Sequence, residues 1–278
     1  MRFESLNADL KRWLQASIEA GHDREVLQRA MRTSGYDSGF ARGAVEAALT
    51  RLQGQAAVVP TKPGAQPFAG AANTVAASDR TVDILMTLAS PRVVLLGNLL
   101  SGEECEQMIE AARRKLARST VVNAATGAYD VHPDRTSSGT HFERGETELV
   151  SRIEQRISEL IDCPAENGEP LQVLHYTPGA EYKPHYDYFD PAQPGTAAVL
   201  KRGGQRVGTL VMYLHVPKNG GGTVFPDVGL EVAPVKGHAL FFSYDRPHES
   251  TGTLHGGSPV TDGEKWVATK WMREGVFG

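Results

Sequence analysis

The spacing of hydrophobic residues divides the chain into three stretches of different character. Within residues 6–52 apolar side chains recur at helical intervals, and this pattern predicts three short amphipathic helices, the second with Asp23 as its N-cap. Residues 55–80 consist mainly of Ala, Gly, Pro and Thr, and their prolines interrupt any helix, so a flexible linker is expected. We therefore predict a small helical domain over 1–54, a linker over 55–80 and a larger domain over 81–278.

The larger domain is predicted to combine two helices with many short strands. A capping box at Ser101 and Glu104 starts the first helix, and an apolar stripe predicts the second over about 146–161. Short apolar runs between turn residues predict strands near 93–96, 172–176, 182–187, 206–216, 222–225, 230–232, 239–243 and 266–272. Many short strands with frequent turns favour an α+β fold, a double-stranded β-helix (jelly roll) with flanking helices packed outside.

Composition restricts the classes of function. The chain has 278 residues and a formal net charge of −4, which argues against a nucleic-acid partner bound through a broad basic surface. No apolar run reaches the length of a membrane span, and residues 1–12 lack the apolar core of a secretory signal, so no membrane partner is expected. Cys105 and Cys163 cannot form a disulfide framework, and we interpret them as small buried hydrophobic residues in a reducing, cytoplasmic setting.

The segment Tyr182–Asp187 contains two candidate metal ligands. His185 and Asp187 are two residues apart, so an extended strand would project both side chains from one face. With one more histidine they would form the two-histidine, one-carboxylate site that suits non-haem Fe(II), although a solvated pair on an edge strand would have the same spacing. Spacing alone does not choose between His248 and His255 as the third ligand.

Lys265 is the candidate for binding a cosubstrate. An Fe(II) oxygenase with this ligand set needs an electron-donating cosubstrate, usually 2-oxoglutarate (2OG), whose far carboxylate requires a cation deeper in the barrel. Lys265 follows His255 by ten residues, after a turn, and therefore falls on the next strand at a suitable depth. The alternative interpretation is an exposed lysine on an edge strand, which would prevent pairing with another chain.

Several sequence blocks resemble, taken together, the prolyl 4-hydroxylase branch of the 2OG/Fe(II) dioxygenases. The blocks are Tyr176–Gly179, Tyr182–Asp187, Arg206–Thr209, Tyr213–Leu214, Gly220–Pro226, Pro234–Phe242, His255–Val260, Gly263–Trp266 and Lys270–Trp271. They occur in order within about residues 90–275, so the N-terminal helices and the linker lie outside the resemblance. One departure is Gly256, where the family often has alanine, a difference of one methyl group beside a ligand position.

This resemblance implies an activity and a set of site residues. The implied iron ligands are His185, Asp187 and His255. The implied cosubstrate-binding residues are Lys265, Tyr176, Thr209 and Tyr213. The implied walls of a peptidyl-proline site are Tyr182 and Trp271, although these aromatic residues have core packing as their alternative. The expected reaction consumes O₂ and 2OG, hydroxylates a prolyl residue of a peptide or protein and releases succinate and CO₂, with ascorbate restoring Fe(II).

Two other readings of the sequence concern the substrate and the presence of catalysis. The same iron chemistry could act on another side chain or on a small molecule, because the metal site does not encode the substrate. Alternatively, the chain is an inactive binding module that works through its N-terminal helices. Competent residues at all four metal and cosubstrate positions argue against an inactive module. Residues 120–142 are expected to form a long loop or an irregular hairpin, and a further loop is expected from His248 to Gly256. Loops 120–142 and 188–205 are expected to act as lids over a peptide.

Overall fold

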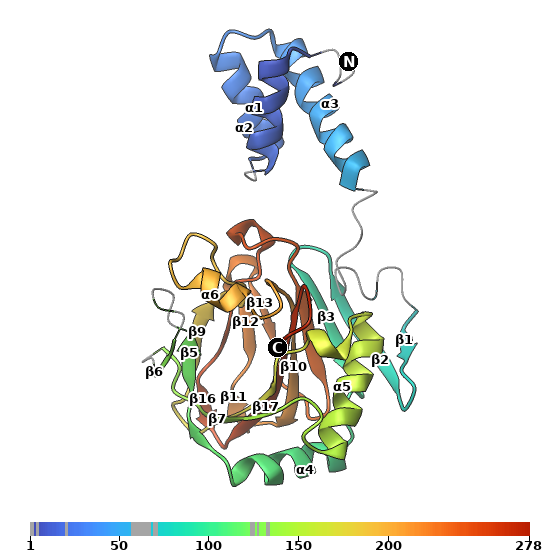
Figure 1. Ribbon diagram of the computed structural model, residues 1–278, viewed down its shortest axis with the longest axis vertical. Coiled ribbons are helices and arrows are strands. Elements are labelled where there is room, and N and C mark those ends of the chain that lie inside the picture. Colours follow the sequence, from blue (N-terminus) through green and yellow to red (C-terminus); the bar gives the residue numbers. More distant parts are fainter. Residues whose placement is uncertain are drawn as a thin grey trace. The chain divides into compact units, whose positions relative to one another are not determined.

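The structure is a computed structural model that describes residues 3, 6–19, 22–56, 68, 72–122, 126, 128–131 and 134–278. The chain divides into two units, Met1–Pro60 and Thr61–Gly278. Figure 1 shows that the first unit is helical and that the second consists of β-sheets with helices beside them. Each unit has a hydrophobic core of its own.

Three helices make up the described part of the first unit, namely α1 (Ala8–Glu19), α2 (Arg24–Thr33) and α3 (Ser38–Ala56). The predicted cap starts α2, because Asp23 Oδ1 accepts a hydrogen bond from the backbone N–H of Val26 at 2.8 Å. The apolar stripes of the helices meet in a core of fully buried side chains that includes Leu14, Leu27, Met31, Val45 and Ala48. The helical pattern of the sequence is therefore present, and α3 continues four residues beyond it.

The stretch expected to be a linker, 55–80, is described only in part. Residues 57–67 and 69–71 lie outside the described residues. At the far end of the stretch, β1 (Thr74–Ala76) pairs with β2 (Thr81–Leu88), and the Asp79 carboxylate forms an ion pair with Arg156 at 2.6 Å. Residues 72–80 are therefore part of the second unit, a position that their small and polar composition did not indicate.

A nine-stranded antiparallel sheet forms the larger wall of the second unit, in the order β1-β2-β3-β14-β10-β17-β8-β7-β4. The bounds of its other strands are β3 (Arg92–Gly97), β4 (Ala117–Arg118), β7 (Ser138–Phe142), β8 (Leu171–Tyr176), β10 (Arg206–His215), β14 (Ala239–Ser243) and β17 (Lys265–Arg273). At its centre, β10 pairs with β17 so that Thr209 lies opposite Trp271 and Tyr213 lies opposite Val267. Strands β10 and β17, which are far apart in sequence, are thus neighbours in the sheet and bring candidate site residues such as Thr209 and Trp271 side by side.

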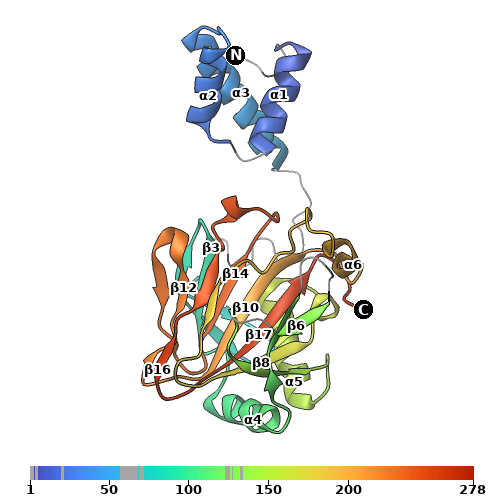
Figure 2. The same ribbon diagram turned by 90° about the vertical axis from the view of Figure 1, so that its left-hand side faces the viewer.

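A four-stranded sheet packs against the inner face of the large sheet (Figure 2). Its strands, in the order β13-β12-β15-β9, are Leu230–Val232, Thr223–Phe225, His255–Gly257 and Tyr182–His185. Phe225 of the small sheet meets Phe242 of the large sheet edge to face, with ring centroids 5.4 Å apart. Two sheets face to face confirm the predicted jelly roll. Two short ribbons complete the strands, β5 (Thr120–Val122) with β6 (Tyr129–Val131) and β11 (Asn219–Gly220) with β16 (Val260–Asp262).

Helices α4 (Gly102–Arg113) and α5 (Glu148–Ile161) pack on the outer face of the large sheet. The predicted capping box starts α4, since Ser101 Oγ accepts from Glu104 N and the Glu104 carboxylate accepts from Ser101 N. Alternate residues of β10, Leu210 and Met212, join the core beneath these helices. The odd-numbered residues of this part of β10, including Thr209 and Tyr213, therefore face the small sheet.

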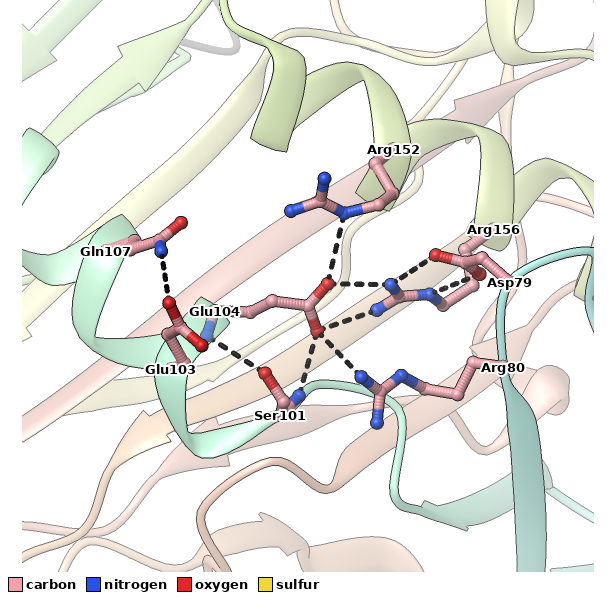
Figure 3. A pocket seen from close by; sticks show the side chains of 8 residues that line it. All are labelled: Asp79, Arg80, Ser101, Glu103, Glu104, Gln107, Arg152 and Arg156. Atoms are coloured by element: carbon pink, nitrogen blue, oxygen red, sulfur yellow. Dashed lines mark hydrogen bonds and ion pairs between the residues drawn. The ribbon is translucent and has the colours of Figure 1, made fainter.

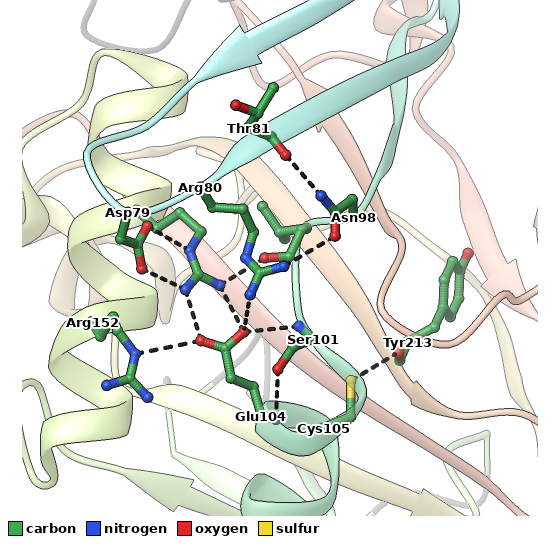
Figure 4. Close-up of polar contacts among 11 residues, drawn as sticks. Asp79, Arg80, Thr81, Asn98, Ser101, Glu104, Cys105, Arg152 and Tyr213 are labelled. Carbon is green, nitrogen blue, oxygen red and sulfur yellow. Dashed lines mark hydrogen bonds and ion pairs between the residues drawn. The ribbon is translucent and has the colours of Figure 1, made fainter.

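A cluster of charged side chains, centred on Arg156, Glu104 and Asp79, links α5, α4 and the segment before β2 (Figures 3 and 4). The guanidinium of Arg156, 1% exposed, donates to Glu104 at 2.7 Å and to Asp79 at 2.6 Å. Burial alone would raise the pKa of Glu104. The hydrogen bonds that its carboxylate accepts from Arg156 and from the Ser101 backbone have the larger effect, and they lower this pKa to about 2. Arg80 and Arg152 also contact Glu104, and the cluster borders a cavity of about 330 Å³ on this outer side.

Several segments differ from the expectations. Loop 188–205 contains a short helix, α6 (Thr196–Leu200). In residues 120–142, β5 and β6 form the hairpin that is one of the two expectations, and β7 additionally joins the large sheet. The region expected as a loop up to Gly256 ends in a strand, β15, because His255–Gly257 pair with β9 and β12. Among the helices described, none combines the length and the apolar character that crossing a bilayer requires.

Candidate metal centre and cosubstrate pocket

Strand pairing brings His185 and His255 together. β9 and β15 run antiparallel, and their register places His255 directly opposite His185. The two imidazole rings have centroids 4.4 Å apart. His248, the other candidate, lies on the surface, where its Nδ1 contacts the Ser250 hydroxyl at 2.9 Å. The register of β9 against β15 thus selects His255, and not His248, as the third candidate ligand.

Asp187 completes a three-residue cluster. It follows β9 by two residues, and its carboxylate oxygens lie 3.5 Å from His185 Nε2 and 3.5 Å from His255 Nε2. One ligand atom from each of the three residues lies within 4.8 Å of the others. Among the described residues, this is the only group of three or more His, Cys, Asp or Glu side chains so arranged.

Backbone carbonyls fix the tautomer of both histidines. Nδ1 of His185 lies 2.9 Å from the carbonyl oxygen of Lys183, and Nδ1 of His255 lies 3.0 Å from that of Thr253. A carbonyl oxygen can only accept, so each Nδ1 carries the proton and each Nε2 presents a lone pair to the cluster. Burial also lowers the pKa of His255 to about 4, which keeps its imidazole neutral at physiological pH.

Hydrogen bonds orient the Asp187 carboxylate and favour its ionised form. Thr209 Oγ1 donates to Asp187 Oδ2 at 2.7 Å, and the Tyr244 hydroxyl lies 3.1 Å from Thr209 Oγ1. Burial raises the pKa of Tyr244, so its phenol retains the proton that it donates to Thr209. Burial raises the pKa of Asp187 as well, but His255, His185 and Arg206 outweigh that effect and hold it below its ordinary value.

Lys265 lies deep in the same unit and is 4% exposed. It is the first residue of β17, a central strand, which excludes the edge-strand alternative. Its ammonium lies 5.5 Å from the ring centroid of Tyr176 and 5.8 Å from that of Tyr213. Burial alone lowers its pKa to about 8, and in the described part of the chain no carboxylate forms an ion pair with it.

The alternation of side chains relates Lys265 to the metal cluster. On β17, Lys265 and Trp271 are an even number of residues apart and share the inner face, as do Thr209 and Tyr213 on the neighbouring β10. Four strand residues span roughly 13 Å. Thr209 marks the end with Asp187, and Tyr213 marks the end with Lys265. The metal cluster and the Lys265 ammonium therefore lie at two ends of one inner face, in the arrangement that a ligand with two acidic ends requires.

The two aromatic residues expected at the substrate site lie near the cluster. Tyr182 stacks on His185 with ring centroids 3.7 Å apart, and the guanidinium carbon of Arg135 lies 4.8 Å from the centroid of the Tyr182 ring. Trp271 lies against Arg206, whose guanidinium carbon is 4.1 Å from the indole centroid. Trp271 Nε1 is buried and has no hydrogen-bond partner among the described residues. An unpaired buried donor of this kind is costly unless a ligand accepts from it.

Sequence reasoning missed several residues that support the cluster. Tyr244 was not singled out, and Arg206 appeared only within a block of the resemblance, without a role. Arg206 donates to the Asp187 carbonyl at 3.2 Å and binds Glu169 through two bonds of 2.6 and 2.9 Å. No local signal identifies them, since their partners are distant in sequence. Gly256 matters more than one methyl suggests, because a Cβ there would lie 2.8 Å from the Tyr182 carbonyl oxygen.

The donor set fits a metal ion and a dicarboxylate. Two neutral imidazoles and one carboxylate match the facial three-ligand arrangement of non-haem Fe(II), which leaves other positions for ligands. The buried ammonium of Lys265, which lacks a carboxylate partner among the described residues, fits the distal carboxylate of 2OG. Gly221 has φ +70°, and a Cβ there would lie 3.2 Å from Lys265 Cδ, so this glycine leaves room for the lysine stem.

The fold and the cluster define the class, and comparison with known proteins agrees. The model of the 2OG-Fe(II) oxygenase superfamily matches residues 171–273. Prolyl 4-hydroxylase 5 of Arabidopsis thaliana is 44% identical over 209 residues, which cover 67% of this chain and 70% of the relative. Prolyl 4-hydroxylase 1 of the same plant is 45% identical over 203 residues, covering 66% and 70%. The chain therefore belongs to the prolyl 4-hydroxylase branch of the 2OG/Fe(II)-dependent dioxygenases.

A solved structure agrees with this assignment. The viral collagen prolyl hydroxylase of Paramecium Bursaria Chlorella virus-1, in complex with 2OG, is 32% identical to this chain. The match has a TM-score of 0.51 and covers 65% of this chain and 95% of the viral chain. The protein is thus an enzyme of the 2OG/Fe(II) dioxygenase class, with a jelly roll and additional N-terminal helices.

Proposed function

We propose that this protein hydroxylates prolyl residues in a peptide or protein and converts 2OG and O₂ to succinate and CO₂. The observation that carries the proposal is the pairing of two features on one inner face. These are the cluster of His185, Asp187 and His255, and the buried ammonium of Lys265. The relatives that share this chain's sequence are named prolyl 4-hydroxylases, which supports peptidyl proline as the substrate.

The first part of the proposal concerns the metal. His185 Nε2, His255 Nε2 and one Asp187 oxygen would hold Fe(II), which supplies the activation of O₂ when it is bound. The carbonyls of Lys183 and Thr253 keep the two imidazoles oriented, so little rearrangement is needed on binding. Thr209 holds the Asp187 carboxylate and thereby supports the metal, besides forming part of the pocket wall.

The second part concerns the ligands of the pocket. Lys265 would bind the distal carboxylate of 2OG, with Tyr176 and Tyr213 forming the walls of the pocket beside it. Tyr182 and Trp271 would line the site of the prolyl residue, and the unpaired Trp271 Nε1 could donate to a peptide carbonyl. Both parts of this assignment rest on the inner-face positions of these side chains.

The remaining assignments concern the N-terminal domain, the reductant and the cellular compartment. Residues 1–54 are proposed to form a separate packing or docking domain, which the independent core of α1–α3 supports. Ascorbate, as the reductant that restores Fe(II), remains a prediction of the family resemblance. The cytoplasmic setting remains a prediction too, and the free, buried thiols of Cys105 and Cys163 support a reducing environment.

A coupled assay tests the proposed function. The protein is incubated with Fe(II), 2OG, O₂ and a synthetic oligoproline peptide, and succinate formation is compared with the peptide mass. We expect the peptide to gain one oxygen atom per succinate formed, with the oxygen placed on proline by fragmentation. Peptide-independent succinate formation together with an unmodified peptide would instead favour the same chemistry on another side chain or on a small molecule.

Replacing Thr209 by valine tests the support of Asp187. The variant keeps the shape of the side chain but leaves Asp187 Oδ2 without its 2.7 Å donor, so Fe(II) affinity should fall by about 10- to 100-fold. Anaerobic titration with Fe(II) and 2OG, followed by visible absorption, measures the change. Thr140→Val is the matched control, because this buried threonine lies on β7 and pairs with Val173 of the outer core. Equal affinities in both variants would contradict the role of Thr209.

A further inference from the structure

A short C-terminal segment contacts the loop that follows the metal-binding strand. We call Glu274–Gly278, the residues after β17, the strap, and residues 189–205 the loop. Figure 2 shows the C-terminus beside α6, which lies within the loop. Backbone bonds join the two segments, from Glu274 N to Gln205 O at 2.9 Å and from Gly275 N to Gly203 O at 2.8 Å. The strap therefore lies along the end of the loop.

The close fit of the two segments depends on glycine. Gly203 has φ +83°, a region that side chains rarely adopt. A Cβ at this position would lie 2.9 Å from the carbonyl oxygen of Gly275 and 3.0 Å from that of Val276. The end of the loop is thus shaped to lie flat against the strap.

Gln205 closes the two ends of the loop on each other. Its amide accepts from Phe189 N at 2.8 Å and donates to the Phe189 carbonyl at 2.7 Å. The same residue's backbone N–H donates to Glu274 Oε2 at 2.9 Å. The start of the loop, its end and the strap consequently form one hydrogen-bonded unit, which begins two residues after Asp187.

A ladder of alternating rings and guanidinium groups runs from the strap to the proposed substrate wall. The distances from guanidinium carbon to ring centroid along it are 4.3 Å for Arg202–Phe277, 5.4 Å for Arg273–Phe277, 4.8 Å for Arg273–Phe189, 4.7 Å for Arg206–Phe189 and 4.1 Å for Arg206–Trp271. Each contact is a cation–π pair, and Phe277, 7% exposed, joins the strap to both the loop and β17. Loss of the Phe277 ring would therefore remove a packing partner from both Arg202 and Arg273.

We propose that the strap holds the loop in place beside the metal centre and that Phe277 is the positioning residue through which it acts. Phe277 does not touch the candidate metal ligands in the described contacts. It acts through Arg273 and Phe189 on Arg206, whose guanidinium lies against Trp271 of the proposed substrate wall. With the proposed function, on which this consequence rests, the strap controls affinity for the peptide while leaving 2OG binding at Lys265 unchanged.

Limited trypsin digestion and steady-state kinetics of the full chain test this proposal. The test variants are Phe277→Ala and Arg202→Met, the second at an exposed position where global folding is not at stake. The controls are Val276→Ala, a neighbouring strap position that is 66% exposed, and Phe277→Tyr, which keeps a ring between the two guanidinium groups. Melting temperatures are measured for all four variants, and cleavage after Lys201, which is exposed within the loop, reports the opening of the loop.

We expect both test variants to accelerate cleavage after Lys201 by about fivefold or more, because the loop loses its anchors. The KM for a synthetic oligoproline peptide should rise roughly tenfold, while the KM for 2OG and peptide-independent 2OG turnover stay within about twofold. Both controls should match the wild type. Unchanged cleavage, or a parallel loss of peptide-dependent and peptide-independent turnover, would overturn the proposal. A wild-type protein inactive on the peptide would refute the proposed function, and the cleavage rates would still decide the role of the strap.

Discussion

Asp187→Asn should abolish 2OG turnover, with a loss of at least about a thousandfold, equivalent to roughly 4 kcal/mol or more of barrier. Asparagine keeps the size of the side chain and can still accept from Thr209 Oγ1. It lacks the negative charge that, with two neutral imidazoles, balances a divalent ion. The expected result is therefore a folded protein that neither retains metal nor forms succinate, measured by elemental analysis and by a succinate assay.

The matched control for this variant is Asp162→Asn. Asp162 caps the end of α5 with φ 49°, a backbone conformation that asparagine also tolerates. Its activity and metal content should equal those of the wild type. Wild-type-like turnover by Asp187→Asn would show that the cluster of His185, Asp187 and His255 is not the reaction centre.

Lys265→Met should raise the 2OG concentration required for turnover by about a hundredfold or more. Methionine preserves the length of the side chain but leaves the distal carboxylate of 2OG buried without a cation. Because Lys265 is 4% exposed, solvent cannot replace the lost charge. The measurement is the KM for 2OG in a succinate assay, with Lys218→Met, at a side chain that is 79% exposed, as the control. An unchanged KM would mean that another cation binds the cosubstrate.

The pH dependence of 2OG use supplies a second test of Lys265. Burial lowers its pKa to about 8, so the ammonium is charged below pH 8 and loses its proton above it. Only the charged form attracts the distal carboxylate, so kcat/KM for 2OG, which reports the free enzyme, should fall as the pH rises through 8. In Lys265→Met this particular fall should be absent. A profile that is flat in the wild type between pH 7 and pH 9 would contradict the assignment.

Much of the fold and part of the site follow from local patterns. The capping box at Ser101 and Glu104 and the cap at Asp23 involve residues within one helical turn, so sequence predicts them. The spacing of His185 and Asp187 likewise predicts that they lie close together, but the predicted strand over 182–187 is too long, since β9 ends at His185 and Asp187 lies in the bend that follows. Strand β1, by contrast, has only three residues in an alanine-rich stretch, so its two β-branched residues are too short a run to predict a strand, and it forms through its pairing with β2.

The sequence pattern did not predict the buried ion pairs. Arg156 lies within the apolar stripe of α5 and would be expected at the surface. It is buried because Asp79 and Glu104, distant in sequence, neutralise it. Arg206 and Glu169 are a similar case beside Asp187. Such pairs form only when the fold supplies the partner, since an isolated buried charge is too costly.

The sequence by itself determined elements that depend on periodicity and on near neighbours, namely helices α1 to α5, the closeness of His185 and Asp187, and eight of the strands (β3, β8, β9, β10, β12, β13, β14 and β17). The tertiary structure decided which distant side chains join them. The register of β9 against β15 selected His255 over His248, and the central position of β17 buried Lys265 rather than exposing it at an edge. Register and burial are properties of strands brought together by folding, which local spacing along one chain does not contain.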